Sequence, residues 1–476
     1  MIFLVLGALI SMTGCKKEYE IPVVTAPGST TVEVSKSVEL SFGFNAEGGY
    51  KSSSLTATGG TATVKTAPST GSRYGNIVVT FTAGSVTGAG SVVINITDNY
   101  NNTGQSTAVI DVLSVPTTSV TSNITTNTTW ETGKVYILEG RITVLSGVTL
   151  TIQPGVIIKG REGSEANATA LLIARGGKLM SEGTADSPII FTSVADKILP
   201  GEVASPNLEP NISGLWGGLL ILGKAPISAE AEAMQIEGIP ASDLNGLYGG
   251  TQANDNSGVL KYISIRHGGA NIGEGNEING LTLGGVGSGT VIENIEIVSN
   301  DDDGIEWFGG TVNVKNVIVW NTGDDAIDTD QSWGGTLDNF IIINPGDECL
   351  ELDGPEGTMV AKHIIKNGTV YAGNAQGIAD LDDANNSSDS YVDIDKVYFF
   401  GLKTGQDFDA VPTYYNCTFS NMETTLPAGT ALTDFFKDGS SAFATTVNTG
   451  ANSVGADASA FTGWSWTAVS GSLNGF

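Results

Sequence analysis

One short phrase recurs three times in the second half of this chain, each time with acidic residues ahead of a hydrophobic one. The copies are DDDGIEWF at 301–308, GDDAIDTD at 323–330 and GDECLELD at 346–353. Their central hydrophobic residues, Ile305, Ile327 and Leu350, follow one another at intervals of 22 and 23 residues. A period of this length is typical of a solenoid in which each repeat forms one coil that stacks on the next. The repeat therefore predicts that these three residues point into one continuous core.

Short apolar segments broken by Gly, Ser or Pro precede these copies. Two of them are GVTLTIQPGVIIKG at 147–160 and GGKLMSEGTADSPIIFTS at 176–193. Both phrases resemble coils of right-handed parallel β-helices, in which successive strands stack about 4.8 Å apart. We therefore predict an all-β chain whose main part, residues 131–422, is a right-handed parallel β-helix.

The repeating pattern is interrupted once and ends before the C-terminus. Residues 195–258 are an insertion, and the segment AEAEAMQIEGI at 229–239 within it has the composition of a helix. Residues 423–476 are predicted to form a C-terminal cap that shields the last coil and buries Trp464 and Trp466.

Residues 29–115 alternate between apolar and polar side chains, as in VELSF at 38–42. Alternation with period two, together with many Val and Thr residues, is typical of strands with one buried face. Strands so short and evenly spaced indicate a β-sandwich, and residues 97–112 resemble the last strands of bacterial immunoglobulin-like repeats. We predict an immunoglobulin-like spacer here, joined to the β-helix by a Ser/Thr/Asn-rich linker at 116–130.

The N-terminus begins with an apolar run, IFLVLGALI at 2–10, which is shorter than the about 20 residues that cross a bilayer. The segment MTGC at 12–15 follows and resembles a bacterial lipobox, which implies a signal peptide at 1–14 and acylation of Cys15. The Lys-Lys-Glu that comes next is similar to the tag of surface-exposed Bacteroidetes lipoproteins. The chain is therefore expected at the outer membrane, lipid-anchored through a tether at 15–28 and facing the cell exterior.

The charge balance narrows the range of partners. The chain carries 51 acidic and 22 basic residues, for a net charge of −29. A nucleic-acid-binding protein needs a basic surface, so this class is excluded, and cations or neutral ligands are the natural partners. Besides Cys15 only Cys349 and Cys417 are present, which rules out a disulfide framework.

The acidic residues of the three copies occupy equivalent positions on successive coils. They are Asp302, Asp303, Asp324, Asp325, Asp328, Asp347 and Glu348. Stacking brings such charges about 5 Å apart, where they repel one another unless a counter-charge is present. Oxygen ligands of this kind favour Ca²⁺, which takes about six to eight of them, so these residues are candidate calcium ligands. The alternative is that they accept hydrogen bonds from backbone amides and only cap the coil bends.

Catalysis is a third hypothesis for the same acidic residues. The segment NTGDDAID at 321–328 is similar to acidic motifs of the polygalacturonase family, which implies an inverting hydrolase that uses Asp303, Asp324 and Asp325. A calcium-dependent polysaccharide lyase would need a basic residue near the metal, and Arg266 is the candidate, unless it forms a salt bridge to the acidic residues. The polygalacturonase family's Gly-His-Gly and Arg-x-Lys motifs are missing, which favours a protein without catalytic activity.

Three tryptophans fall at or near the predicted coil bends. Trp307, Trp320 and Trp333 either stack on sugar rings or on a partner protein, or belong to the core. The sequence leaves both interpretations open.

Longer phrases carry a resemblance that covers most of residues 130–476. LKYISIRHGG at 260–269 and the stretch 276–310 resemble Bacteroidetes-type outer-membrane lipoproteins with a parallel β-helix, pectin-lyase-like domain and an N-terminal immunoglobulin-like domain. The resemblance implies the fold but no activity. We expect a surface-exposed lipoprotein that binds a glycan or an outer-membrane protein complex, or has a structural role, with calcium as its cation. The alternative is a polysaccharide lyase or inverting hydrolase.

Overall fold

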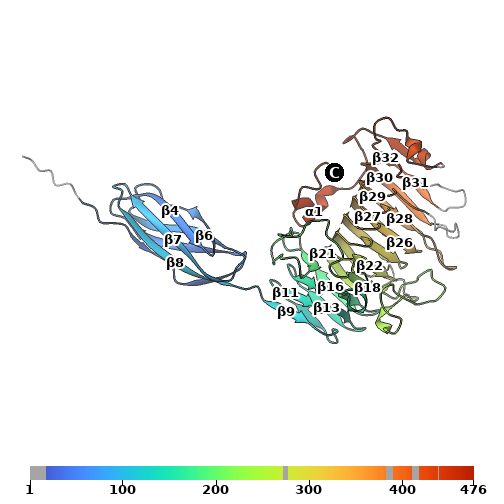
Figure 1. Ribbon diagram of the computed structural model, residues 1–476, viewed down its shortest axis with the longest axis horizontal. Coiled ribbons are helices and arrows are strands. Elements are labelled where there is room, and N and C mark those ends of the chain that lie inside the picture. The colour runs from blue at the N-terminus through green and yellow to red at the C-terminus, as the bar shows by residue number, and fades with distance from the viewer. Residues whose placement is uncertain (1–17, 272–276, 382–389, 410–416, 438) are drawn as a thin grey trace, which may run out of the picture. The chain divides into compact units, whose positions relative to one another are not determined.

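The structure is a computed structural model that describes residues 18–271, 277–381, 390–409, 417–437 and 439–476. The predicted signal peptide, 1–14, and the predicted acylation site, Cys15, lie outside the described residues. The chain divides into two compact units, Met1–Val115 and Pro116–Phe476 (Figure 1). Within the described residues, no helix is long and apolar enough to span a membrane.

The N-terminal unit consists of two four-stranded sheets. The first has the order β1 (Val23–Thr25), β3 (Ser37–Asn45), β6 (Tyr74–Ala83) and β5 (Gly60–Thr66). The second has the order β2 (Thr30–Glu33), β8 (Thr103–Leu113), β7 (Gly88–Asp98) and β4 (Tyr50–Thr58). Every second residue of β6 is buried, including Ile77, Val79 and Phe81, which confirms the alternation seen in the sequence.

The chain joins this unit earlier than expected. The ring of Tyr19 stacks on that of Tyr100 with their centroids 4.1 Å apart, and β1 already pairs with β3 from Val23. The predicted tether, 15–28, is therefore corrected to a shorter segment. Tyr19 stacks on the N-terminal unit and Val23–Thr25 pair with its strand β3, so these residues are part of the unit.

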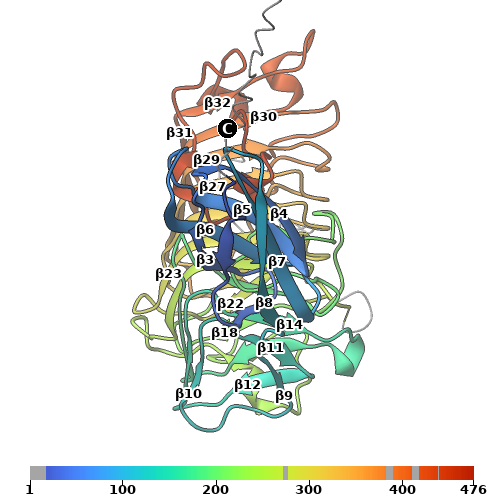
Figure 2. The same cartoon turned by 90° about the vertical axis from the view of Figure 1, so that its left-hand side faces the viewer.

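The C-terminal unit is a parallel β-helix whose coils stack strand on strand (Figures 1 and 2). One face of the helix has the strand order β9 (Thr117–Val120), β11 (Val135–Leu138), β14 (Ile157–Gly160), β17 (Ile189–Ser193), β21 (Gly258–Arg266), β23 (Val291–Val298), β25 (Val314–Trp320), β27 (Thr336–Ile343), β29 (His363–Tyr371), β30 (Val392–Phe400), β32 (Met422–Thr424) and β33 (Ala444–Thr446). The strands that join it from the side are β10 (Thr128–Trp130), β13 (Thr149–Ile152), β16 (Lys178–Glu182) and β31 (Thr418–Ser420).

The opposite face is a separate seven-stranded parallel sheet, which we call the second sheet. Its strands, in order, are β12 (Arg141–Val144), β15 (Ala170–Ile173), β18 (Leu219–Leu222), β22 (Leu281–Gly284), β24 (Ile305–Phe308), β26 (Ile327–Gln331) and β28 (Leu350–Glu351). Ile305 aligns with Ile327 and Ile327 with Leu350, and all three are fully buried. The repeat read from the sequence therefore gave the correct register of the coils.

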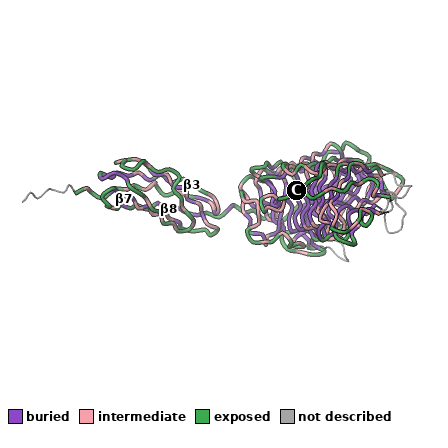
Figure 3. The backbone as a smooth tube through the Cα atoms, turned by 90° about the horizontal axis from the view of Figure 1, so that it is seen from above, coloured by how far each residue is buried: buried purple, intermediate pink, exposed green. Residues whose placement is uncertain are grey.

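The long strands of the first face bend at one residue in the left-handed backbone region. Asn294, Asn316 and Asn339 take φ values of 59°, 56° and 63° at equivalent positions, a conformation that asparagine tolerates better than most residues. Their amides also bond to one another, with Asn316 Nδ2 and Asn339 Nδ2 each donating to the preceding asparagine at 2.8 Å. One continuous cluster of buried hydrophobic side chains runs through the coils, and Figure 3 colours most of the stacked strands of this unit as buried.

Three expectations about the connecting segments need correction. Residues 116–130 are not a plain linker, because β9 and β10 within them pair in parallel with β11 and β13. The insertion at 195–258 contains β18, a regular strand of the second sheet. Residues 229–239 form no helix but contain the short strand β19 (Met234–Gln235), which pairs with β20 (Leu247–Tyr248); the hairpin pairing outweighs the helical composition.

The C-terminal cap, predicted at 423–476, is also different from what was expected. Its first part continues the coils, since β32 pairs in parallel with β30 of the first face and β33 pairs in parallel with β32. Residues 456–476, which we call the strap, pack instead on the outer side of the middle coils. Phe461, Trp464 and Trp466 are buried there against a patch that includes Val298, Ile318, Trp320, Ile341 and Ile343. The strap includes η5 (Ala458–Phe461) and α1 (Trp466–Val469) (Figure 1).

Candidate functional site

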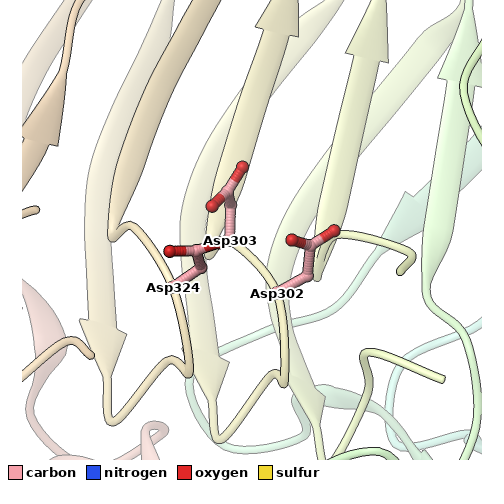
Figure 4. A group of neighbouring side chains, drawn as sticks. All are labelled: Asp302, Asp303 and Asp324. Carbon is pink, nitrogen blue, oxygen red and sulfur yellow. The ribbon is translucent and has the colours of Figure 1, made fainter. Parts of the chain in front are cut away.

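The acidic residues of the repeat lie where each coil turns into the second sheet. They form an acidic corner that we define as Asp302, Asp303, Glu306, Asp324, Asp325, Asp328, Asp330, Asp347, Glu348 and Glu351 (Figure 4 shows three of them). Adjacent coils approach closely here. A Cβ atom on Gly346 would lie 1.8 Å from the carbonyl oxygen of Gly323 on the preceding coil, so only glycine fits and the acidic residues that follow stack directly.

Two carboxylates of the corner hold the bend of the next coil. Asp303 Oδ1 accepts a hydrogen bond from the backbone N–H of Asp325 at 3.0 Å. Asp325 Oδ1 in turn accepts one from the backbone N–H of Glu348 at 2.6 Å. The capping hypothesis therefore holds for Asp303 and Asp325, and each of them keeps a second oxygen for other ligands.

The other side chains form two groups that share Asp303. One ligand oxygen from each of Asp302, Asp303 and Asp324 lies within 4.8 Å of the other two, and the same is true of Asp303, Glu306 and Asp328. Calcium–oxygen distances of about 2.3–2.6 Å allow one ion to contact all three oxygens of such a group. Figure 4 shows Asp302, Asp303 and Asp324 on neighbouring coil bends with their carboxylates close to one another. We call them the outer triad.

The remaining predicted ligands lie further along the corner. Asp347 and Glu348 belong to neither triad. Glu348 lies over the next coil, where a Cβ atom on Gly377 would be 2.1 Å from its carboxylate oxygens. The structure therefore brings together Asp302, Asp303, Asp324 and Asp328 of the predicted metal ligands and gives Asp325 a backbone-capping role.

Burial and mutual repulsion make the charged form of these carboxylates costly. Burial, followed by the charges of neighbouring carboxylates, raises the pKa of Asp302 to about 7 and that of Glu348 to about 8. The same causes raise the pKa values of Asp303 and Asp328 well above their ordinary range. Among the described residues, none of the ion pairs involves a carboxylate of the corner.

A second stacked column of charges on the same β-helix is arranged differently. Its members align coil by coil in the order Glu182, Lys261, Glu293, Lys315, Asp338, Lys366 and Asp395. The sign alternates at every step, and Lys261 Nζ lies 3.2 Å from Glu293 and Lys366 Nζ lies 3.8 Å from Asp338. Opposite charges on neighbouring strands stabilise a sheet, whereas like charges destabilise it. The acidic corner lacks this alternation, because its aligned residues Glu306, Asp328 and Glu351 are all acidic.

These raised pKa values predict an unusual pH dependence for the protein in excess chelator. From about pH 7 to about pH 8.5, the folded protein loses protons from Asp302, Asp330 and Glu348, whose pKa values are about 7, 7 and 8. The unfolded chain has already lost them, so the free energy of unfolding falls as the pH rises. Differential scanning calorimetry should show a lower melting temperature at the higher pH. A melting temperature that is unchanged or rises over this range would contradict the electrostatics described above.

Arg266 is buried and pairs with a residue outside the acidic corner. It is fully buried at the end of β21 on the first face, with Nε 2.7 Å from Ser264 Oγ and Nη2 3.6 Å from a carboxylate oxygen of Glu296. Its guanidinium also lies 5.0 Å from the ring centre of Trp466 in the strap. Both sequence hypotheses for Arg266, as a catalytic base and as a salt-bridge partner of the acidic residues, are corrected, because its charge partner is Glu296.

The three candidate binding tryptophans are buried, two inside the coils and one beneath the strap. Trp307 and Trp333 are fully buried and stack on one another with ring centroids 4.7 Å apart, and Trp333 also stacks on His363 at 5.3 Å. Trp320 is 8% exposed and packs edge-on against Trp466 of the strap. The binding hypothesis is corrected for Trp307 and Trp333, which are fully buried and cannot stack on a sugar, and Trp320 is largely covered by the strap.

The metal ligands predicted from the sequence omit Glu306, Asp330 and Glu351 of the corner, and the neighbouring Asn279 was also missed. Glu306 was not among the predicted metal ligands, although the repeat places it in line with Asp328 and Glu351, and the structure confirms this alignment. Asn279 comes from the coil before the first copy, and its amide contacts the Glu306 carboxylate. The alignment of the three copies was a signal for Glu306, whereas no local pattern marks Asn279.

Comparison with known proteins places the fold. A family model described as a pectate-lyase like beta helix domain matches residues 122–467. Similar solved structures include the catalytic unit of a thermostable GH87 α-1,3-glucanase from Streptomyces thermodiastaticus, with 12% identity over 90% of this chain and 89% of that chain and a TM-score of 0.32. Another is a family 28 exopolygalacturonase from Yersinia enterocolitica, with 11% identity over 92% and 100% and a TM-score of 0.21. No curated protein matches the chain.

Proposed function

The chain belongs to the pectate-lyase-like β-helix family, and we propose that it is a surface-exposed lipoprotein with a non-catalytic role in the outer membrane. In this proposal it binds a glycan or a partner protein, or has a structural role, and Ca²⁺ stiffens its acidic corner. Acylation of Cys15 would anchor it to the membrane, and the two-sheet N-terminal unit would act as its spacer. The lipobox-like segment and the net charge of −29 support the location and the cationic partner.

The observation that carries the calcium proposal is a stack of acidic side chains that form no ion pair with any Lys, Arg or His in the part of the chain that the structure describes. Three coils in succession place carboxylates at the same bend, and those of the outer triad have oxygens within 4.8 Å of one another. The alternating column from Glu182 to Asp395 is the internal comparison, because the same coils pair opposite charges there. A divalent cation with a preference for oxygen ligands supplies the missing charge.

The geometry of the corner favours a binding or structural role over hydrolysis. An inverting hydrolase keeps its two carboxyl groups about 6.5–9.5 Å apart to admit a water molecule, whereas the outer triad brings oxygens within 4.8 Å. Asp325 bonds to the backbone of the next coil, and Arg266 is buried against Glu296. The short distances within the outer triad support ion binding over hydrolysis, and the pairing of Arg266 with Glu296 supports a binding role over a lyase mechanism.

Replacing Asp302 and Asp324 together by asparagine tests the proposal. Asp303 and Asp325 cap the backbone of the next coil, so this pair of substitutions leaves both capping side chains in place. In the unchanged protein, calcium at about 1,000 times its dissociation constant should add about 4 kcal/mol of stability, seen as a rise in melting temperature. The Asp302→Asn, Asp324→Asn variant should lose most of this rise while it melts at or above the temperature of the unchanged protein in chelator.

The matched control is Asp111→Asn with Asp186→Asn, which removes the same charge from two exposed sites and should keep the full calcium response. The same samples are incubated with polygalacturonate, and no new reducing or unsaturated sugar ends are expected. An equal calcium response in both variants would refute the corner as the calcium site. Release of sugar ends that is lost in the corner variant would make the protein an enzyme.

A further inference from the structure

A second group of three carboxylates shares Asp303 with the outer triad and extends deeper into the corner through Glu306 and Asp328. Asp303, Glu306 and Asp328 are 7%, 5% and 7% exposed, and one oxygen from each lies within 4.8 Å of the other two. We call them the inner triad. Glu306 and Asp328 are aligned on β24 and β26, so the pairing of these strands fixes their separation. Three buried negative charges at this distance are strongly destabilising unless protons or a cation neutralise them.

A buried side-chain amide, which has a neutral oxygen, contacts the same triad through its nitrogen. Asn279 is 4% exposed, and its amide nitrogen contacts the Glu306 carboxylate and lies 3.4 Å from Thr282 Oγ1. Its amide oxygen is buried and has no hydrogen-bond partner among the described residues. A buried, unpaired amide oxygen costs free energy, and this cost disappears when the oxygen coordinates a cation.

Part of the insertion closes this end of the corner. Tyr248 packs against Phe308 of β24 with their ring centroids 5.7 Å apart, and its hydroxyl accepts a hydrogen bond from Gln331 Nε2 of β26 at 3.0 Å. Ile236 and Ile239 of the insertion belong to the same buried cluster as Phe308 and Tyr248. The second sheet next to the inner triad is therefore covered by apolar side chains, which slow the exchange of any bound ion with solvent.

From this arrangement we propose a second, buried divalent-cation site formed by Asp303, Glu306, Asp328 and the amide oxygen of Asn279. This second site depends on the proposed calcium site in one respect only: the two sites share Asp303, whose carboxylate bridges the two ions. Asp303 keeps one oxygen beside its backbone hydrogen bond, Glu306 and Asp328 supply up to four, and Asn279 supplies one more, which reaches the lower end of the about six to eight that Ca²⁺ takes. The outer ion lies beside the exposed Asp324 and exchanges readily, whereas the inner ion is retained and ties β24 to β26 and to the preceding coil through Asn279.

The test counts calcium ions that stay with the full chain. The protein is loaded with Ca²⁺ at neutral pH and desalted, and bound calcium is measured by mass spectrometry before and after brief exposure to chelator. The unchanged protein should hold two ions, of which one survives the chelator. Glu306→Gln should hold one ion that the chelator removes, and Asp302→Asn should hold one ion that survives it. Asp186→Asn, at an exposed site, should behave like the unchanged protein.

The two sites can fail separately in this experiment. If the unchanged protein holds a single ion that Asp302→Asn removes and Glu306→Gln does not, the inner site is refuted and Glu306 shares a proton with Asp328 instead. If the chelator-resistant ion is found but Asp302→Asn changes nothing, the outer site fails and the inner one stands. Should Glu306→Gln not fold, Asn279→Ala replaces it, and unchanged retention of calcium in that variant would overturn the proposal.

Discussion

Replacing Glu296 by alanine should lower the free energy of unfolding by about 3–5 kcal/mol, the cost of leaving a buried charge without its partner. Glu296 is fully buried, and its carboxylate lies 3.6 Å from Nη2 of Arg266. It also accepts hydrogen bonds from the backbone N–H of Trp466 at 3.1 Å and from the N–H and hydroxyl of Thr467 at 2.8 Å each. One side chain therefore neutralises a buried guanidinium and holds the strap on the β-helix.

The asymmetry between the two partners makes this prediction specific. Arg266→Met removes the guanidinium but leaves Glu296 with the donors of the strap and with Ser264 Oγ at 2.5 Å, so it should destabilise the protein less than Glu296→Ala. Guanidinium denaturation followed by tryptophan fluorescence measures both, and limited proteolysis should cut the strap sooner only in Glu296→Ala. Equal losses in the two variants, or intact resistance to proteolysis, would contradict the role assigned to Glu296.

Replacing Trp333 by alanine should also cost about 3–5 kcal/mol of stability, as large-to-small changes of buried tryptophan do. Trp333 lies between Trp307 and His363 in a stack inside the coils, and its Nε1 donates to the carbonyl oxygen of Val312 at 2.9 Å. Removing the central ring leaves a cavity that the surrounding strands cannot fill, because the ladder pairing fixes their spacing. Calorimetry on the full chain measures the effect.

Trp333→Phe is the conservative control for this position. It keeps one aromatic ring in the stack and loses the second ring of the indole with its Nε1 hydrogen bond, so its stability should lie between that of Trp333→Ala and that of the unchanged protein. If Trp333→Ala were as stable as the unchanged protein, the ring would have to be exposed, and its interpretation as a ligand-binding surface would return.

The sequence revealed the register of the coils because the copies are local and almost identical in length. Ile305, Ile327 and Leu350 were predicted to align from spacing alone, and they do. The same alignment brought Asp302, Asp303 and Asp324 together. A fixed period means that one correct assignment determines the neighbours of every residue in the stack, which is why so much of the corner was predictable.

The features that were missed depend on contacts between distant segments. Glu296 and Trp466 meet across 170 residues, and no periodicity connects the strap to the middle coils. Arg266 and the tryptophans were misassigned because the sequence fixes neither the face of a coil on which a side chain lies nor what covers it. Residues 116–130 have the composition of a linker, yet they pair as β9 and β10 since the next coils offer open strand edges.

The alternating column of charges is a further feature that could not be predicted from the sequence. Lys315 and Asp338 align only when the coil lengths between them are known, and these lengths vary along the chain. Once the register is known, the contrast between this column and the acidic corner becomes the main argument for a bound cation. The repeat revealed the acidic column in the sequence, but the alternating column appears there only as scattered charges, so the two could not be compared before the register was known.

The most direct test of the calcium site is a crystal structure of the full chain grown with Ca²⁺, with data collected at a wavelength that gives an anomalous signal from calcium. The account predicts an anomalous difference peak between Asp302, Asp303 and Asp324, at a distance of about 2.3–2.6 Å from their oxygens. A map without a peak at the corner, with Asp302 and Asp324 turned apart into solvent, would contradict it.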